Sequence, residues 1–170
     1  VEERTELIAE MEPDLLIIAP FSRETMSTPA ETYMGHLCRM LPVRELWVGT
    51  NFALGRRREG DVPRLREIGT QLDYQVATVD PVQIDNEPVS SSRIRRLLNM
   101  GNIEGVVPLM GRPFTLRSMV IEGDHRGKQI GFPTANLHIA PWHALPSDGV
   151  YACRARVAGD SYPAVTNIGV

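Results

Sequence analysis

The sequence predicts an α/β unit followed by a β unit, and three observations carry this prediction. Up to about residue 110, short apolar runs alternate with helical stripes, a pattern typical of a parallel sheet covered by helices. After Gly111, extended segments alternate with glycine- and proline-rich loops, as in an antiparallel barrel or sandwich. The charge changes at the same place: residues 1–111 carry 12 Lys/Arg and 17 Asp/Glu, a net −5, whereas residues 112–170 carry 6 and 4, a net +2. We therefore expect domains at 1–110 and 111–170.

The first elements are predicted from local patterns. An apolar stripe indicates a helix within residues 2–11, and the continuous apolar run 15–19 indicates a buried strand. Thr28 followed by Pro29 is typical of a capped helix start, so a helix is expected from there to about Leu41. The other elements expected in this unit are strands at 45–48 and 74–79 and helices at 62–72, 90–100 and 102–110. In the second unit, extended segments are expected over 113–122, 149–157 and 162–168.

The composition narrows the class of protein. Hydrophobic residues make up 42% and charged residues 23%, as in ordinary soluble proteins, and no apolar run approaches the ~20 residues of a membrane-spanning helix. Cys38 and Cys153 lie far apart and form no CxxC pattern, so we expect reduced thiols and a cytoplasmic location. The net charge of −3 favours neither nucleic acid nor membrane as a partner.

The segment Gly123–Leu137, GDHRGKQIGFPTANL, carries the most specific chemistry. Its glycines allow the backbone to approach a ligand, and exposed backbone N–H groups in such a loop can bind an anion. Arg126 and Lys128 add positive charge, while Thr134 and Asn136 offer neutral oxygens of the kind that Mg²⁺ accepts. The segment therefore predicts a site for nucleotide phosphates and their metal ion. The alternative is a turn in which Thr134 and Asn136 bond the local backbone.

Two further segments of the first unit have the chemistry of ligand sites. Residues 89–95, VSSSRIR, place a serine cap and two arginines at a helix start, where phosphate can bind the free N–H groups. Residues 46–61, LWVGTNFALGRRREGD, form a loop after a strand, where Phe52 could stack on a flat ring. The alternatives are a plain capped helix with surface arginines, a core position for Phe52, and a solvated face for residues 56–58.

These motifs resemble those of a known family. The PTAN loop is similar to the signature of riboflavin kinases, and segments 46–61 and 89–95 resemble the flavin-side segment and the ISSTxIR-type motif of bacterial FMN adenylyltransferases. Both domains occur in this order in the bacterial bifunctional riboflavin kinase/FMN adenylyltransferase (FAD synthetase) family. The resemblance implies a partial Rossmann-like nucleotidyltransferase domain followed by part of a flavokinase-type antiparallel β-barrel.

The resemblance also implies roles for particular residues. The kinase part would bind ATP phosphates through Gly123, Gly127, Lys128, Gly131, Thr134 and Asn136. The adenylyltransferase part would bind ATP through Ser90, Ser91, Ser92, Arg93 and Arg95. Flavin would contact Asn51, Phe52 and Arg56, and Mg²⁺ would contact Thr134 and Asn136. The expected substrates are ATP with riboflavin or FMN, and the expected products are FMN and FAD.

Two motifs of that family have no counterpart in this sequence. The HxGH-type motif is missing, and the nearest string, Gly35-His36, lies within a predicted helix and is no substitute. The general-base glutamate of the kinase is expected beyond Val170, since none of Glu122, Asp124 and Asp148 matches its position in the family. We therefore expect a fragment with little activity alone and with strand edges open to self-association. Two other functions stay open: a non-catalytic nucleotide or nucleic-acid binding module, and a nucleotidyltransferase acting on another phosphate acceptor.

Overall fold

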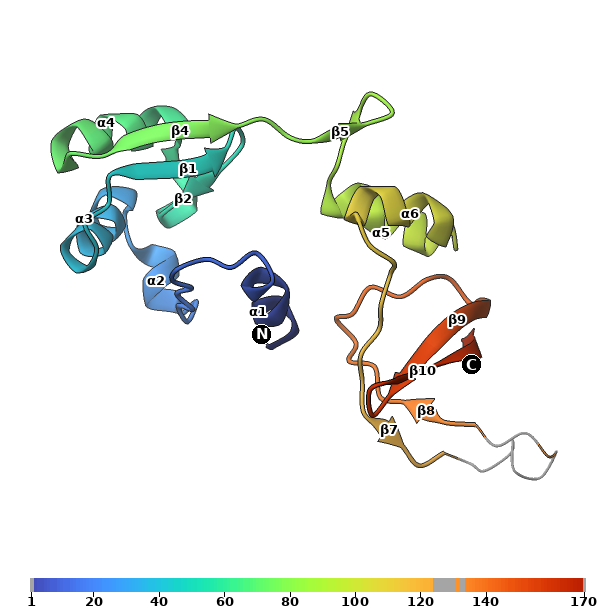
Figure 1. Ribbon diagram of the computed structural model, residues 1–170. Helices are drawn as coiled ribbons and strands as arrows, with labels where there is room; N and C mark the ends of the chain where they lie inside the picture. Colours follow the sequence, from blue (N-terminus) through green and yellow to red (C-terminus); the bar gives the residue numbers. More distant parts are fainter. Residues whose placement is uncertain (1, 124–130, 132–133, 170) are drawn as a thin grey trace. The chain divides into compact units, whose positions relative to one another are not determined.

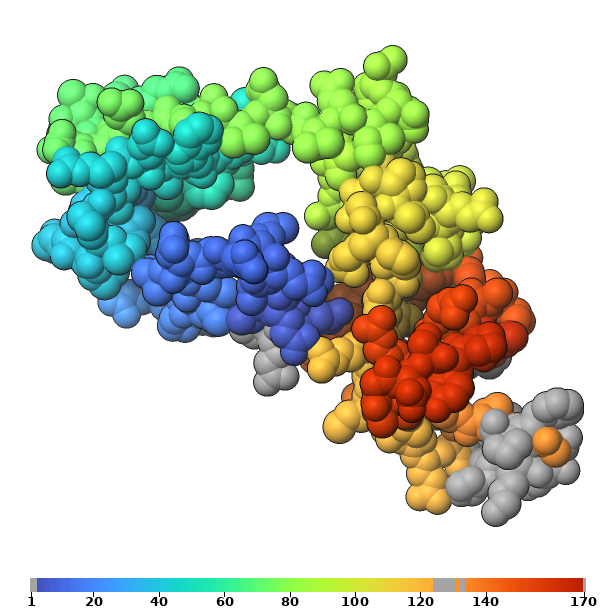
Figure 2. Space-filling view, in the orientation of Figure 1, coloured from blue at the N-terminus to red at the C-terminus, as the bar shows by residue number. Residues whose placement is uncertain are grey.

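The computed structural model describes residues 2–123, 131 and 134–169, and it divides into two compact units, Val1–Pro81 and Val82–Val170. The division comes earlier than residue 110 because two helices of the second unit pack with its β part. The backbone N–H of Ser147, for example, donates to the carbonyl of Leu98 at 3.0 Å. Figure 2 shows the yellow helix pair in contact with the orange and red segments of the same unit. The boundary predicted at 110/111 separates kinds of secondary structure rather than packing units, and it stays a prediction.

The first unit contains a short parallel sheet with α3 and α4 packed together against it. Its elements are α1 (Glu2–Ala9), α2 (Arg23–Ser27), α3 (Ala30–Met40), β1 (Glu45–Gly49), β2 (Ala53–Leu54), the 3-10 turn η1 (Arg56–Arg58), β3 (Gly60–Asp61), α4 (Val62–Leu72) and β4 (Gln75–Val79). Strands β1 and β4 pair in parallel, with Trp47 opposite Ala77, and Figure 1 shows them side by side with α4 alongside β4. The predicted helices 2–11 and 62–72 and both predicted strands after residue 44 are confirmed.

The core of this unit lies between α3, α4 and the sheet. Its buried members are Ala30, Met34, Leu65, Ile68 and Tyr74. Helix α4 begins where the Asp61 carboxylate accepts the backbone N–H of Arg64 at 3.0 Å, and its apolar positions at 62, 65, 68 and 72 share one face. The Asp61 cap, Pro63 in the first turn and this apolar face all indicate the same helix, which is why its bounds were predictable.

The strand predicted over residues 15–19 is wrong. The segment is irregular, and Leu15, Ile17 and Ile18 are exposed. A strand requires a neighbour for its N–H and C=O groups, and among the described residues β1 and β4 pair only with each other. An apolar run specifies burial but supplies no such partner.

Tyr74 makes the stability of this unit sensitive to alkaline pH. Its ring is buried, its hydroxyl donates to the Leu65 carbonyl at 3.0 Å, and burial, with a smaller effect of Cys38, raises its pKa from 10.0 to about 12. The unfolded chain therefore loses this proton first, and between about pH 10 and 12 the free energy of unfolding should fall by roughly 1–2 kcal/mol.

Urea unfolding from pH 8 to 11.5 measures this decline. Tyr74→Phe removes the hydrogen bond and should lower the free energy of unfolding by about 1 kcal/mol at pH 8. Its free energy of unfolding should then fall much less steeply as the pH rises. An equally steep decline in Tyr74→Phe would mean that another group is responsible.

The second unit combines two helices with short antiparallel pairs. Its elements are β5 (Gln83–Ile84), β6 (Glu87–Pro88), α5 (Ser91–Asn99), α6 (Ile103–Met110), β7 (Val120–Ile121), β8 (Asn136–Leu137), β9 (Gly149–Val157) and β10 (Asp160–Ile168). Both helices match their predictions, including the serine cap at Ser90. Strands β9 and β10 form a hairpin through Ala158 and Gly159, both at positive φ, which confirms the extended segments expected there.

The extended segment predicted over 113–122 is wrong for most of its length. Only Val120–Ile121 forms a strand, because it alone finds a ladder partner, Asn136–Leu137. The described residues contain antiparallel pairs but no closed barrel. The coarser prediction, α/β followed by β, is confirmed. Within the described part of the chain, no helix has the length and apolar character that crossing a membrane would require.

Candidate functional site

The loop after β1 occupies the ligand-binding edge expected of an α/β unit. Because β1 and β4 are parallel, their carboxyl ends, Gly49 and Val79, share one edge of the sheet. The loop turns at once, with the Phe52 N–H donating to the Gly49 carbonyl at 2.9 Å. Asn51 is exposed and Phe52 is 38% exposed, so Phe52 is not a core residue. Two of the three predicted flavin contacts, Asn51 and Phe52, are thus accessible at this edge.

The continuation of this loop is fixed to the start of α3. The Arg56 N–H donates to the Thr28 carbonyl at 2.8 Å, and the Glu59 carboxylate accepts the Ala30 N–H at 3.0 Å. The prediction that Thr28 caps this helix is therefore wrong: Pro29 holds the cap position without a side-chain bond, and Glu59 supplies the acceptor. The loop and the helix start form one rigid corner.

The three arginines of this loop are not equivalent. Arg56 forms an ion pair with Glu59 at 3.7 Å, and the Arg58 guanidinium donates to the Asn51 carbonyl at 3.1 Å. Arg57 is exposed, has no hydrogen bond or ion pair with another described residue, and sits at φ 55°. Arg57 is therefore the most available cation for an anionic ligand, and no signal in the run Arg56–Arg58 distinguishes it in the sequence.

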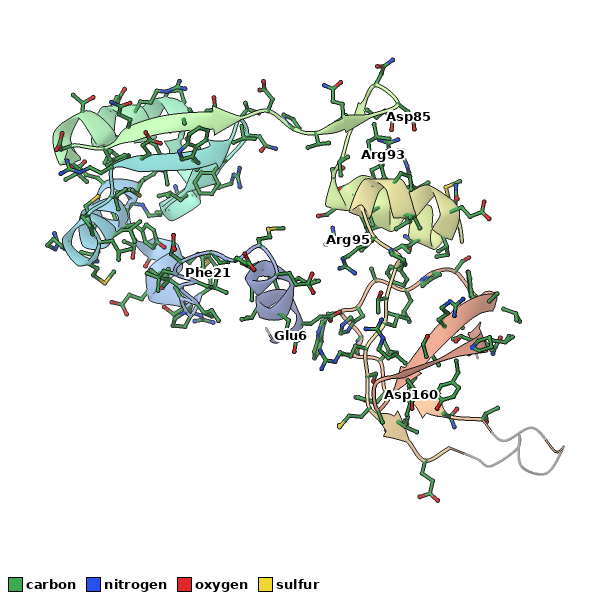
Figure 3. The ribbon with its side chains drawn as sticks, viewed as in Figure 1. Glu6, Phe21, Asp85, Arg93, Arg95 and Asp160 are labelled. Carbon is green, nitrogen blue, oxygen red and sulfur yellow. The ribbon has the colours of Figure 1, made fainter. Side chains whose placement is uncertain are left out.

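The serine motif also separates into distinct parts. The Ser90 hydroxyl caps α5 by accepting the Arg93 N–H at 3.2 Å, whereas Ser91 and Ser92 are exposed in the first turn. The Arg93 side chain lies against the β5–β6 hairpin, and Arg95 extends from another side of the helix (Figure 3). Arg95 is exposed and has no partner among the described residues. Of the two predicted arginines, Arg95 is the one free to meet a phosphate.

The PTAN oxygens lie at the start of a short strand pair. Asn136 begins β8 opposite Ile121, and Thr134 lies two residues earlier. Both side chains are exposed and neither bonds another described residue, so the described contacts do not support the alternative of a locally bonded turn. Gly123 lies against Asn136, and Gly131 has φ +82°. Gly127 and Lys128 lie outside the described residues.

The oxygens of Thr134 and Asn136 suit a hard cation such as Mg²⁺. A hydroxyl and an amide carbonyl are neutral ligands, and Mg²⁺ in nucleotide sites commonly takes few protein ligands besides phosphate oxygens and water. No group of three or more His, Cys, Asp or Glu that could hold a metal ion occurs among the described residues. The two side chains therefore fit a metal that arrives with its nucleotide.

A shallow hollow of about 540 Å³ lies elsewhere on the first unit. It opens at the amino ends of β1 and β4, where Arg44 pairs with Asp73 at 3.0 Å. These strand ends are opposite to the edge that carries Asn51 and Phe52. The hollow is thus separate from the predicted flavin contacts, and its ion pair is solvent-exposed.

An exposed loop at the carboxyl ends of parallel strands, followed by a serine-capped helix start, is typical of nucleotide-binding α/β proteins. Residues 1–93 match the family described as FAD synthetase, and residues 110–170 match the family described as riboflavin kinase. The first match covers more than half of the chain, and the chain belongs to the FAD synthetase family.

Curated relatives carry both activities in their names. "Bifunctional riboflavin kinase/FMN adenylyltransferase" of Listeria monocytogenes is 29% identical over 99% of this chain and 54% of its own length. The proteins of that name from Bacillus subtilis and Escherichia coli K12 are each 30% identical over 99% of this chain and cover 53% and 54% of their own lengths. The chain thus spans about half the length of the curated relatives it matches.

A solved structure shares the fold. "Macrolide-efflux Protein from Streptococcus pneumoniae" has a TM-score of 0.85 and 27% identity, and the similarity covers 99% of this chain and 54% of that one. Its name differs from those of the curated relatives, which refer to flavin chemistry.

Proposed function

We propose that this chain serves FAD biosynthesis, as part of an enzyme that phosphorylates riboflavin to FMN and adenylylates FMN to FAD. One observation carries the proposal: each predicted phosphate site includes polar side-chain groups that form no hydrogen bond or ion pair with another described residue. These groups are Arg95 beside the first turn of α5, and Thr134 and Asn136 near β8. The two family matches, in the order adenylyltransferase then kinase, support the same assignment.

In the kinase reaction the riboflavin 5′-hydroxyl attacks the γ-phosphorus of ATP, releasing ADP and the hydroxyl proton. Phosphoryl transfer depends mainly on positioning and on neutralising charge. Thr134 and Asn136 would orient the phosphates and hold Mg²⁺, which neutralises their charge when bound. Gly123 and Gly131 would let the backbone approach the nucleotide. The glutamate base of the family is not among these residues.

In the adenylyl transfer the FMN phosphate attacks the α-phosphorus of a second ATP and releases pyrophosphate. The first N–H groups of α5, at Ser91 and Ser92, would meet the ATP phosphates together with the Arg95 guanidinium. Asn51 and Phe52 would contact the flavin ring. Arg57, besides the expected Arg56, would meet the anionic FMN phosphate, because no other described residue forms a hydrogen bond or ion pair with its side chain.

Product analysis tests this proposal. The full-length protein mixed with riboflavin, ATP and Mg²⁺ should yield FMN and then FAD, resolved by chromatography with fluorescence detection. We expect the 170 residues alone to turn over slowly at best while still quenching flavin fluorescence. Absence of flavin binding by the full-length protein would overturn the proposal and favour another phosphate acceptor. Tight, steeply salt-dependent oligonucleotide binding would favour a nucleic-acid module instead.

Gly123→Ala should weaken ATP binding in the kinase reaction through Asn136. An added Cβ would lie 1.9 Å from Asn136 Nδ2 and 2.8 Å from Cγ, so the Asn136 side chain must rotate away. We expect the KM for ATP to rise about tenfold, as for loss of one good hydrogen bond. Combining Gly123→Ala with Asn136→Ala should add little to Asn136→Ala alone. Additive losses would show that Gly123 acts separately from Asn136.

A further inference from the structure

The guanidinium of Arg93 is fully engaged by the β5–β6 hairpin. One terminal nitrogen donates to the carbonyls of Ile84 and Glu87, at 2.8 and 3.1 Å. The Nε atom lies 3.1 Å from the Glu87 carboxylate, and the second terminal nitrogen lies 3.8 Å from the Asp85 carboxylate. All three nitrogens therefore contact the hairpin, one through hydrogen bonds and two through ion pairs, and Arg93 could turn to a phosphate only by giving up most of these contacts.

Burial distinguishes Arg93 from the arginine one turn further along. The Arg93 side chain is 14% exposed. Arg96 also forms an ion pair with Glu87, at 3.7 Å, but its side chain is 64% exposed. Exposed ion pairs contribute little because water screens them, whereas a guanidinium that is largely covered and held by several oxygens is harder to displace. Arg93 is therefore a fixed part of the structure, and Arg96 is a surface charge.

The hairpin leads directly into the phosphate-binding helix start. Its two turn residues, Asp85 and Asn86, have φ of 56° and 59°, as in a type I′ turn. Beyond the two strands the hairpin is extended by one more hydrogen bond, from the Val89 N–H to the Val82 carbonyl at 2.8 Å. Ser90, the cap of α5, follows at once. By binding the hairpin, Arg93 fixes the direction in which the chain enters α5. A two-strand hairpin this short needs such a tertiary contact to be stable.

We propose that Arg93 is a positioning residue, which holds the hairpin so that Ser91, Ser92 and Arg95 are presented to the ATP phosphates. The phosphate contact of the motif then belongs to Arg95, and the two arginines, equal in the sequence, have different roles. This inference rests on the proposed adenylyl transfer.

Steady-state kinetics of FMN adenylylation in the full-length protein separate the two roles. Arg93→Ala should raise the KM for ATP about tenfold with kcat changed less than twofold, while Arg95→Ala should lower kcat/KM about a hundredfold. Glu87→Gln, which leaves every nucleotide contact in place, should reproduce part of the Arg93→Ala effect. The Arg93→Ala/Glu87→Gln pair should be little worse than Arg93→Ala alone. Arg93→Lys should not restore KM, since an ammonium cannot reach acceptors on several sides, and Arg96→Ala is the matched control with no expected effect.

Hydrogen exchange without nucleotide provides the second readout. Arg93→Ala should speed exchange of the amides of residues 83–89 at least tenfold, whereas Arg95→Ala and Arg96→Ala should leave it unchanged. Unchanged exchange in Arg93→Ala, or restoration of KM by Arg93→Lys, would overturn the inference. If the wild-type protein made no FAD, the proposed function would fail, and the exchange data would still decide whether Arg93 holds the hairpin.

Discussion

Gly55→Ala is expected to destabilise the first unit by at least ~3 kcal/mol, because two separate penalties fall on one residue. Gly55 adopts φ 77° and ψ 177°, a region that residues with a Cβ scarcely enter. An added Cβ would also lie 2.6 Å from the backbone nitrogen and 2.8 Å from the Cα of Ala30. These are backbone atoms of a helix start, so no side-chain rotation can relieve the overlap.

The consequence should reach the predicted flavin contacts. Relieving the overlap requires the loop to leave α3, which breaks the bonds from Arg56 to Thr28 and from Ala30 to Glu59. Asn51 and Arg58 are joined by a hydrogen bond, so the whole loop should move with it. Gly55→Ala should therefore weaken FMN binding as well as stability.

Trp47 fluorescence during urea unfolding measures the effect on this unit. Trp142, the second tryptophan of the sequence, lies in the second unit and is replaced by Phe when the first unit is followed. Gly111→Ala is the control for positive φ alone and is followed through Trp142 with Trp47 replaced, because Gly111 lies in the second unit: its φ is 66°, but nothing lies within 4 Å of its added Cβ. Its loss should stay near 1 kcal/mol. An equally small loss for Gly55→Ala would show that the corner is not rigid.

The secondary structure was predictable from the sequence only where its causes lie close together in the chain. Local patterns predicted the elements whose causes are local: Asp61, Pro63 and the apolar stripe determine α4, and period-two alternation with the Ala158-Gly159 turn determines β9 and β10. Residues 15–19 and 113–122 were wrongly predicted because strand formation depends on a neighbour distant in sequence. The β5–β6 hairpin was missed although Asp85-Asn86 is a turn signal, since strands of two residues carry no periodicity.

The candidate site shows the same difference between features with local causes and features that depend on tertiary contacts. Residue types alone marked the serine motif, the arginine loop and the PTAN oxygens as chemically suited to phosphates. Which arginine is free depends on tertiary partners: Glu59 pairs with Arg56, the Asn51 carbonyl accepts from Arg58, and the hairpin engages Arg93. Sequence neighbours with identical chemistry thus acquire different roles.

Thr134→Ala and Asn136→Ala should each lower kcat/KM for riboflavin phosphorylation by about a hundredfold, as when one preorganised oxygen contact to a transferring phosphoryl group is lost. Both side chains are exposed and unbonded among the described residues, so neither substitution removes an internal contact. The unfolding midpoint should therefore change little. FMN adenylylation by the same variants should stay within twofold of wild type, because that reaction uses the start of α5.

Two further variants make this prediction specific. Thr134→Ser keeps the hydroxyl and should retain most of the kinase activity, which a role for the methyl group alone would not allow. Thr115→Ala removes a hydroxyl that bonds the Pro113 carbonyl at 3.2 Å, and it should leave both reactions unchanged. Varying Mg²⁺ at saturating ATP then separates metal from phosphate contact: if Thr134 holds the ion, Thr134→Ala should need several-fold more Mg²⁺ for half-maximal rate. A normal kinase rate in Thr134→Ala would contradict the assignment, since no other hydroxyl of the PTAN segment could replace it.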